Sequence, residues 1–207
     1  MYDIHAAKGY IFDCDGTLLD TIGAWTDAEH DLFVQAGEMT QEQEDEIHSA
    51  PIERAAEILH ERYGVGESAA AVLAHLDGHL LPFYAEKAQA LPGVIEFVRA
   101  AFEQNVPCVV LSSSPRRYLE AGLRHVGILD CFLELITTDE TGCSKQDFAI
   151  YERALRILGT DADETCAIDD APYAIAVMHE FGLHTVCVGG RTSDFADVNV
   201  SSFDELA

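Results

Sequence analysis

The stretch "GYIFDCDGTLLD", residues 9–20, places two carboxylates directly after an apolar run. Asp13 and Asp15 are two residues apart, so their side chains share one face of an extended chain. Two negative charges that lie close together in a poorly solvated place repel each other and shift each other's pKa. The stretch therefore predicts a buried strand whose carboxyl end carries a cation site or a chemical role.

Most of the chain alternates between strand-like and helix-like segments. Short apolar, strand-like runs occupy residues 8–14, 106–114, 131–138, 165–170 and 184–190. Amphipathic, helix-like runs occupy residues 91–105, 115–127, 144–159 and 171–182. Strands and helices that alternate with short links predict an α/β fold with a doubly wound parallel sheet, covered by helices on both faces.

One segment interrupts the alternation after the first strand. It contains no strand-like run and reads as three helices, over residues 21–37, 49–64 and 67–88. We therefore expect a small all-helical domain of residues 17–89, inserted into a core made of residues 1–16 and 90–207.

Composition limits the partners and the location of the protein. The net charge of −25, from 37 acidic and 12 basic residues, repels nucleic acid and anionic lipid, so we expect neither as a partner. No apolar run is long enough to span a membrane, and the N-terminal residues lack the pattern of a signal peptide. The 6 cysteines show no Cys-x-x-Cys spacing, which favours free thiols in a reducing compartment. We expect a cytoplasmic protein.

Polar residues gather where the predicted strands end. Asp13 and Asp15 end the first strand, Ser112 the second and Asp169–Asp170 a later one, while Lys145 is expected to open a helix. Because the carboxyl ends of parallel strands meet at one edge of a sheet, we expect these side chains to converge. Paired carboxylates suit a hard cation, above all magnesium (Mg²⁺), and lysine and serine suit phosphate oxygens.

Each of these features also has a simpler explanation. Asp15, Gly16 and Thr17 make a good turn, and the serines from Ser112 onward can cap the following helix. Asp169–Asp170 can likewise cap a helix. The common placement of all the features at one sheet edge nevertheless favours a shared site.

These motifs resemble those of the haloacid dehalogenase superfamily over essentially the whole chain. "FDCDGT" is similar to its first motif, Asp-x-Asp-x-Thr, and "VVLSSSP", with Ser112, to its second. Lys145 in "SKQDFAIY" resembles the third motif and "AIDD" the fourth. The insertion resembles the helical cap of the phosphatases and of β-phosphoglucomutase. Two departures are "KQDF" in place of Lys-Pro-x-Pro and Asp-Asp in place of Glu-Asp.

The resemblance implies a phosphoric monoester hydrolase that works through an aspartyl-phosphate. Asp13 is implied as the nucleophile and Asp15 as the general acid and base. Dehalogenase relatives lack the second aspartate, so Asp15 argues against halide chemistry.

The resemblance also implies the ligands of metal and phosphate. Mg²⁺ would be held by Asp13, the Asp15 backbone carbonyl and Asp170. Asp169 has a shorter side chain than the usual glutamate and is expected to act through water. The phosphoryl oxygens would be held by Lys145 and Ser112, with help from backbone amides near Cys14 and Ser113.

Residues that contact the rest of the substrate are harder to assign. The candidates are Trp25, His30 and Arg54 in the cap and Arg116 and Arg117 at the core rim. Trp25 also suits the cap interior, and exposed arginines often carry no function. Arg116 is the strongest candidate because it closely follows the second motif.

The leading interpretation is a Mg²⁺-dependent phosphatase that acts on a small phosphorylated metabolite. The alternative is a sugar phosphomutase, which needs a cap arginine and a lysine after the second motif to hold a second phosphate. Glu53 and Pro115 stand nearest to those positions, with Arg54 and Arg116 one position away, which weakens this alternative. A catalytically silent binding protein is disfavoured because no motif residue is missing.

Overall fold

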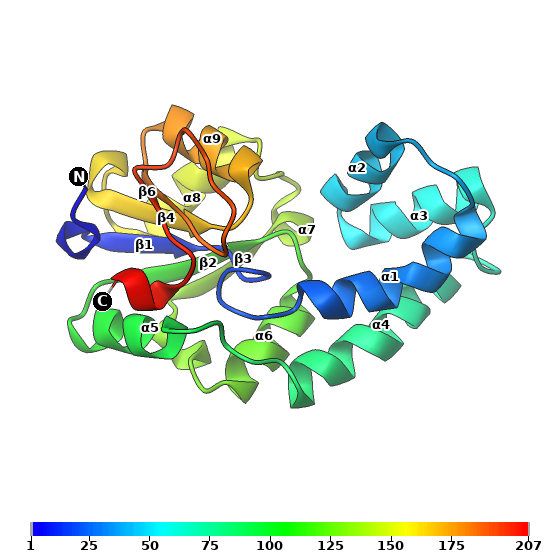
Figure 1. Ribbon diagram of the computed structural model, residues 1–207, viewed down its shortest axis with the longest axis horizontal. Helices are drawn as coiled ribbons and strands as arrows, with labels where there is room; N and C mark the ends of the chain where they lie inside the picture. Colours follow the sequence, from blue (N-terminus) through cyan, green and yellow to red (C-terminus); the bar gives the residue numbers. More distant parts are fainter. Residues whose placement is uncertain (1, 207) are drawn as a thin grey trace.

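A central sheet of parallel strands organises the larger part of the molecule (Figure 1). The computed structural model describes residues 2–206, apart from the side chains of Asp45, His48 and Ser49. The strands are β1 (Gly9–Phe12), β2 (Cys108–Ser112), β3 (Glu134–Thr137), β4 (Thr165–Asp169), β5 (His184–Cys187) and β6 (Val198–Asn199). They lie in the order β3-β2-β1-β4-β5-β6, and all neighbouring pairs are parallel.

The order of the strands places a switch point at β1. The chain adds β2 and β3 on one side of β1 and β4, β5 and β6 on the other, and ligands bind where a parallel sheet reverses its strand order in this way. The predicted doubly wound α/β fold is confirmed. The short strand β6 was not predicted from the sequence.

Helices cover both faces of the sheet, and every residue of β1 is buried. The longer core helices are α5 (Val94–Glu103), α6 (Arg116–His125), α8 (Phe148–Leu158) and α9 (Pro172–Phe181). Shorter turns are α7 (Thr138–Thr141), η1 (Ile4–Ala6), η2 (Leu129–Cys131), η3 (Ala162–Glu164) and η4 (Phe203–Leu206). Alternate side chains of β1 enter opposite layers, since Phe12 packs with α5 and α6 whereas Ile11 packs with α8 and α9.

Four helices form a separate group beside the sheet (Figure 1). They are α1 (Ile22–Ala36), α2 (Gln41–Ser49), α3 (Ile52–Tyr63) and α4 (Ala69–Glu86). The sequence predicted α1, α3 and α4 but not α2, whose sequence is mostly acidic and polar. The start of α2 is fixed locally, because Thr40 and Gln43 cap each other. The backbone amide of Gln43 donates to Thr40 Oγ1, and the backbone amide of Thr40 donates to the side-chain Oε1 of Gln43.

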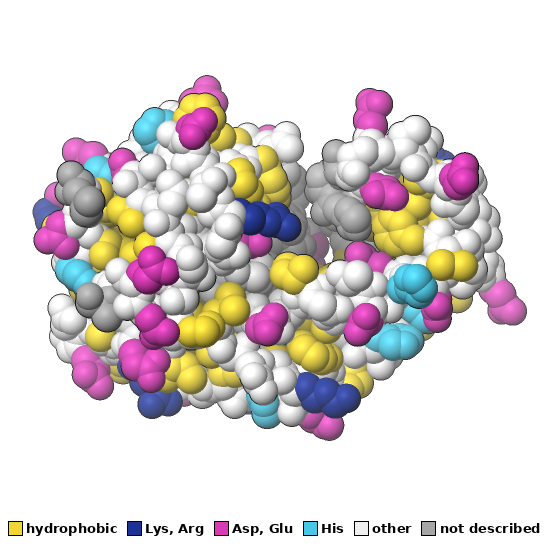
Figure 2. Space-filling view, in the orientation of Figure 1, with side chains coloured by type: hydrophobic (Ala, Val, Ile, Leu, Met, Phe, Trp, Pro, Cys, Tyr) yellow, Lys and Arg dark blue, Asp and Glu magenta, His cyan; other side chains and the backbone are white. Residues whose placement is uncertain are grey.

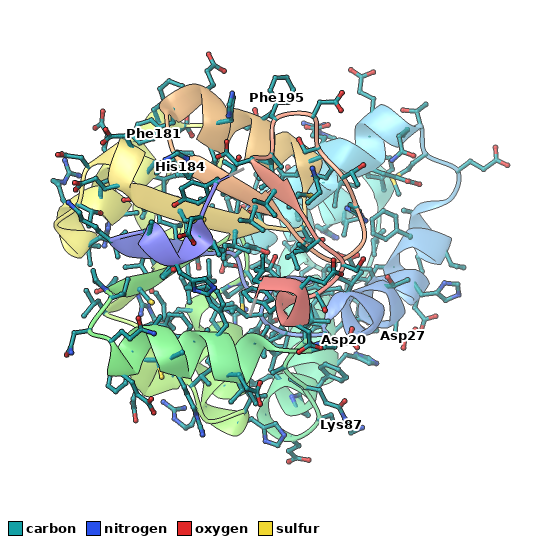
Figure 3. All side chains as sticks on the ribbon, turned by 60° about the vertical axis from the view of Figure 1, so that its left-hand side comes forward. Asp20, Asp27, Lys87, Phe181, His184 and Phe195 are labelled. Carbon is teal, nitrogen blue, oxygen red and sulfur yellow. The ribbon has the colours of Figure 1, made fainter. Side chains whose placement is uncertain are left out.

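The chain crosses twice between the sheet and this helical group, and the two crossings pair with each other. The Asp20 amide donates to the Gln89 carbonyl at 2.9 Å and the Leu91 amide donates to the Leu18 carbonyl at 3.0 Å. Figure 3 shows Asp20 near the start of α1 and Lys87 at the end of α4. The predicted limits of the inserted cap, residues 17–89, adjoin this pairing and stay a prediction.

Helix α4 also packs along the core helix α6 (Figure 1). The contact is close at Gly122, where an added Cβ would lie 2.6 Å from Leu19 Cδ1 and 2.9 Å from Tyr84 Cδ1. Tyr84, near the end of α4, is thereby brought to the sheet edge. None of the helices described over residues 2–206 has the length and apolar character needed to cross a bilayer.

Candidate active site

A buried lysine joins two buried carboxylates at the carboxyl ends of β1 and β4. Lys145 Nζ lies 2.6 Å from Asp13 Oδ1 and 2.8 Å from Asp169 Oδ2. Burial works against the charge on Lys145, but Asp13 and Asp169 raise its pKa well above the usual value, so the side chain is an ammonium. Burial also raises the pKa of Asp13 well above its usual range; Lys145 opposes this effect, and Asp169 adds to it.

Lys145 does not open a helix, which corrects the sequence prediction. It lies in a turn that precedes α8, and α8 begins only at Phe148. The turn is closed by Asp147, whose Oδ2 accepts from the Ser144 amide at 2.7 Å and from its hydroxyl at 2.8 Å. Tyr151, from α8, donates its hydroxyl to the Lys145 carbonyl at 2.6 Å. These bonds hold the "KQDF" loop, in which Lys145 reaches the sheet edge.

Three hydroxyl groups surround the carboxylate of Asp15. Thr21 Oγ1 donates to its Oδ1 at 2.6 Å, and Ser114 Oγ donates to its Oδ2 at 2.6 Å. The hydroxyl of Tyr84 also donates to Oδ1 and itself accepts from Trp25 Nε1 at 2.8 Å. Burial and then the nearby Asp15 raise the pKa of Tyr84 well above its usual value, so it stays a phenol and a donor. The carboxylate is therefore held in one orientation by both the core and the cap helices.

Three carboxylates meet at the sheet edge in a group that suits a metal ion. One oxygen each of Asp13, Asp169 and Asp170 lies within 4.8 Å of the others. Burial, and then the negative charge of Asp169, raise the pKa of Asp170 to about 6. A group made only of oxygen ligands, with this excess of negative charge, fits Mg²⁺. Gly16 allows the arrangement, because a Cβ at this positive-φ position would lie 2.9 Å from Asp170 Oδ2.

Asp169 differs from the other two carboxylates because both of its oxygens already have partners. Its Oδ2 pairs with Lys145, and its Oδ1 accepts from the Ala171 amide at 2.8 Å. This placement fits the expected supporting role of Asp169. The alternative of a simple helix cap is not supported, since the N-cap of α9 is Ala171 and no side chain caps that helix.

The second motif lies beside these carboxylates. Ser112, the last residue of β2, is buried, and its Oγ accepts from the Ser114 amide at 3.1 Å. Ser112 and Ser113 line the same cleft as Asp13 and Lys145. The structure thus brings together all the residues that the sequence assigned to the nucleophile, the acid, the metal and the phosphate.

The residues form the floor of a cleft between the sheet edge and the helical group. Its volume is about 290 Å³, and Figure 2 shows the hollow between the two parts of the molecule. Trp25 lines the cleft as predicted and also belongs to the packed interior through its bond to Tyr84. Tyr173 and Arg191 line the core side and were missed, because neither belongs to a recognisable motif.

The predicted arginines lie elsewhere, which corrects the expectation for Arg116. Its guanidinium binds Glu140 at 2.7 Å, Glu134 at 2.9 Å and the Leu135 carbonyl at 2.6 Å. These acceptors on β3 and α7 draw the side chain away from the cleft.

Arg54 and Arg117 are likewise bound to acidic partners. Arg54 pairs with Glu57 at 2.7 Å on the exposed side of α3. Arg117 pairs with Asp77 at 2.8 Å and covers the ring of Tyr118. Neither these two arginines nor the exposed His30 is among the described residues that line the cleft.

A sequence model of the haloacid dehalogenase-like hydrolases matches residues 7–182. The chain belongs to this family. The resemblance inferred from the motifs, and with it the assignment as a hydrolase, is confirmed.

Several relatives of this hydrolase carry names that describe phosphatases. Validoxylamine A 7'-phosphate phosphatase from Streptomyces hygroscopicus subsp. limoneus is 26% identical, over 92% of this chain and 88% of the relative. Hexitol phosphatase B from Escherichia coli (strain K12) is 25% identical, over 95% and 92%. Phosphoglycolate phosphatase from Rhodospirillum rubrum is 26% identical, over 86% and 78%.

Solved structures share the fold of this hydrolase. CbbY from Rhodobacter sphaeroides, in complex with phosphate, aligns with a TM-score of 0.78 and 22% identity, over 97% of this chain and 96% of that one. A dehalogenase aligns with a TM-score of 0.70 and 18% identity, over 100% and 97%. At these identities the likeness establishes the fold and leaves the reaction to be argued from the site.

Proposed function

We propose that the chain is a Mg²⁺-dependent phosphatase that hydrolyses a small phosphorylated metabolite through an aspartyl-phosphate on Asp13. The observation that carries the proposal is the pair of neighbouring carboxylates in different settings. Asp13 is buried against Lys145, whereas Asp15 accepts three hydroxyl donors at the cleft floor. The family and the relatives named as phosphatases support a phosphoric monoester hydrolase.

The first step transfers the phosphoryl group to the enzyme. A carboxylate oxygen of Asp13 attacks phosphorus, the bond from phosphorus to the ester oxygen breaks, and Asp15 gives a proton to the departing alcohol. The ammonium of Lys145 lies against Asp13, where it offsets negative charge that gathers on the phosphoryl oxygens. Backbone amide groups near Ser113 would donate to the same oxygens.

The second step returns the enzyme to its starting state. Asp15, now ionised, takes a proton from water, the water oxygen bonds to phosphorus, and the bond to Asp13 breaks to release phosphate. Asp13, the Asp15 carbonyl and Asp170 would hold Mg²⁺, with Asp169 in support. When bound, the ion supplies positive charge that offsets the repulsion between these carboxylates and the phosphate.

Two further features support the expected setting of the enzyme. All six cysteines are free thiols, which fits our proposal of a cytoplasmic location. The net charge of −25 supports a small-molecule substrate over nucleic acid.

The test separates a phosphatase from both alternatives. We expect Mg²⁺-dependent release of p-nitrophenol and phosphate from p-nitrophenyl phosphate, and no such release would favour a silent binding protein. With β-glucose 1-phosphate, we expect no activation by β-glucose 1,6-bisphosphate. Rapid bisphosphate-dependent formation of glucose 6-phosphate, with little phosphate release, would identify a mutase instead.

A further inference from the structure

The cleft above the catalytic residues has two unlike halves. Its core side carries the carboxylates, Lys145 and the serines already described. Its cap side is formed mainly by apolar side chains of α1, α2, α3 and α4 and of the segment that joins α2 to α3, among them Trp25, Leu32, Ile52, Leu59 and Leu76. A phosphate that lies at the core side therefore directs the alcohol part of its ester against an apolar wall.

The charges around the cleft are also divided between the halves. Both basic residues among its described lining, Lys145 and Arg191, belong to the core. Lys145 already binds Asp13 and Asp169. The charged residue that the described part of the cap contributes is Glu29, which is acidic. A second phosphate, or a carboxylate on the alcohol, thus meets no cation at the described cap side.

Hydroxyl groups on the alcohol meet a related difficulty. A hydroxyl that leaves water and finds no hydrogen-bond partner weakens binding, while each buried methylene strengthens it. Leu32, Leu59 and Leu76 are each buried and offer no polar atom to the cleft from their side chains. A polyol or sugar would leave hydroxyls unpaired against these three leucines.

We infer that the enzyme selects phosphate monoesters whose alcohol part is predominantly apolar, an alkyl or aryl group without a second anionic group. This inference rests on the proposed phosphatase function and deepens it. Each methylene added to a linear alkyl phosphate should raise kcat/KM about fourfold, the equivalent of ~0.8 kcal/mol, until the wall is covered.

Matched esters test the inference on the wild-type enzyme with Mg²⁺. n-Propyl phosphate and glycerol 3-phosphate have the same carbon chain and differ in two hydroxyls. Ethyl phosphate and phosphoglycolate differ in one carboxylate. We expect kcat/KM to be at least about tenfold higher for the apolar member of each pair. Equal values, or a preference for the polar members, would overturn the inference.

Hydrolysis of p-nitrophenyl phosphate shows whether the inferred substrate class alone is wrong or the proposed phosphatase function as well. If it is hydrolysed while the polar esters are preferred, the substrate class is wrong and the phosphatase stands. If no ester is hydrolysed, both proposals fall.

Two leucines of α4 provide a matched pair of variants. Leu76 and Leu80 are both buried and lie four positions apart, but of the two Leu76 alone is in the described cleft lining. Leu76→Ala removes atoms from the wall and so deepens the cleft. In a series from ethyl to octyl phosphate, the chain length that gives the highest kcat/KM should therefore become longer. Leu80→Ala removes the same atoms from the interior and should leave the optimum unchanged. An optimum that does not move in Leu76→Ala, or that moves equally in both variants, would contradict the assigned wall.

Discussion

Replacing Tyr84 by phenylalanine tests whether the cap helices position Asp15, the proposed general acid. The substitution removes one hydroxyl, which donates to Asp15 Oδ1 and accepts from Trp25 Nε1. Tyr84 is 0% exposed, so water does not readily take the place of the hydroxyl. The bond also connects α4 with the carboxyl end of β1, and its loss leaves Asp15 with the hydroxyls of Thr21 and Ser114 as its donors.

The size of the effect follows from the charge on the acceptor. A hydrogen bond to a charged group contributes roughly 1.5–3 kcal/mol. If that contribution is lost from the transition state in which Asp15 protonates the leaving alcohol, kcat/KM falls about 10- to 150-fold. The loss should appear with n-propyl phosphate, whose alcohol needs the proton. p-Nitrophenolate leaves without a proton, so kcat/KM for p-nitrophenyl phosphate should change by less than about threefold.

The assay compares kcat/KM for both esters, because this parameter reports the steps up to formation of the aspartyl-phosphate. Tyr118→Phe is the matched control. Tyr118 stacks on Tyr84 with ring centroids 5.4 Å apart, but its hydroxyl donates to Asp77 at 2.5 Å and not to Asp15. An equal loss for both esters in Tyr84→Phe, or the same selective loss in Tyr118→Phe, would refute the reasoning.

Three further predictions concern the metal site and two glycines. Asp170→Ala should raise the Mg²⁺ concentration for half-maximal activity about 10- to 100-fold, and Asp169→Ala should raise it less. If a Mg²⁺ titration shows equally small shifts for both variants, neither residue belongs to the metal site. Gly93→Ala should lower the free energy of unfolding by at least about 1–2 kcal/mol in urea, because φ is +79° and a Cβ would lie 2.5 Å from the Asp204 amide nitrogen. Gly78→Ala, in the open interior of α4, should raise it by about 0.5–1 kcal/mol, and a loss of stability there would contradict the packing of this helix.

Much of the core could be predicted because a parallel sheet is buried on both faces. Its strands therefore read as uninterrupted apolar runs, and β1 is such a run over all its residues. Helix α2 was missed since it has little apolar character and is started by a local capping box. Lys145 was placed on a helix because the turn between Ser144 and Asp147, which delays the start of α8, has no apolar pattern.

The site could be predicted only where its residues belong to local motifs. Asp13, Asp15 and Lys145 stand in such motifs, whereas Tyr84 reaches Asp15 across 69 positions of sequence. That contact exists because α4 returns to the core along α6, which no short pattern encodes. The contacts of Arg116 could not be predicted for a similar reason. Its acidic partners lie on β3 and α7, and no short sequence pattern shows that they bind it.

The formation of an aspartyl-phosphate on Asp13 is the central claim. The most direct measurement is rapid acid quenching of the enzyme during turnover of p-nitrophenyl phosphate with Mg²⁺, followed by borohydride reduction and peptide mass spectrometry. The account predicts that an acyl-phosphate is reduced to homoserine at position 13, and that Asp13→Asn, which should lose at least about 100-fold in kcat, shows no such product. Reduction at another carboxylate, or an Asp13→Asn variant that keeps more than about a hundredth of wild-type kcat, would contradict it.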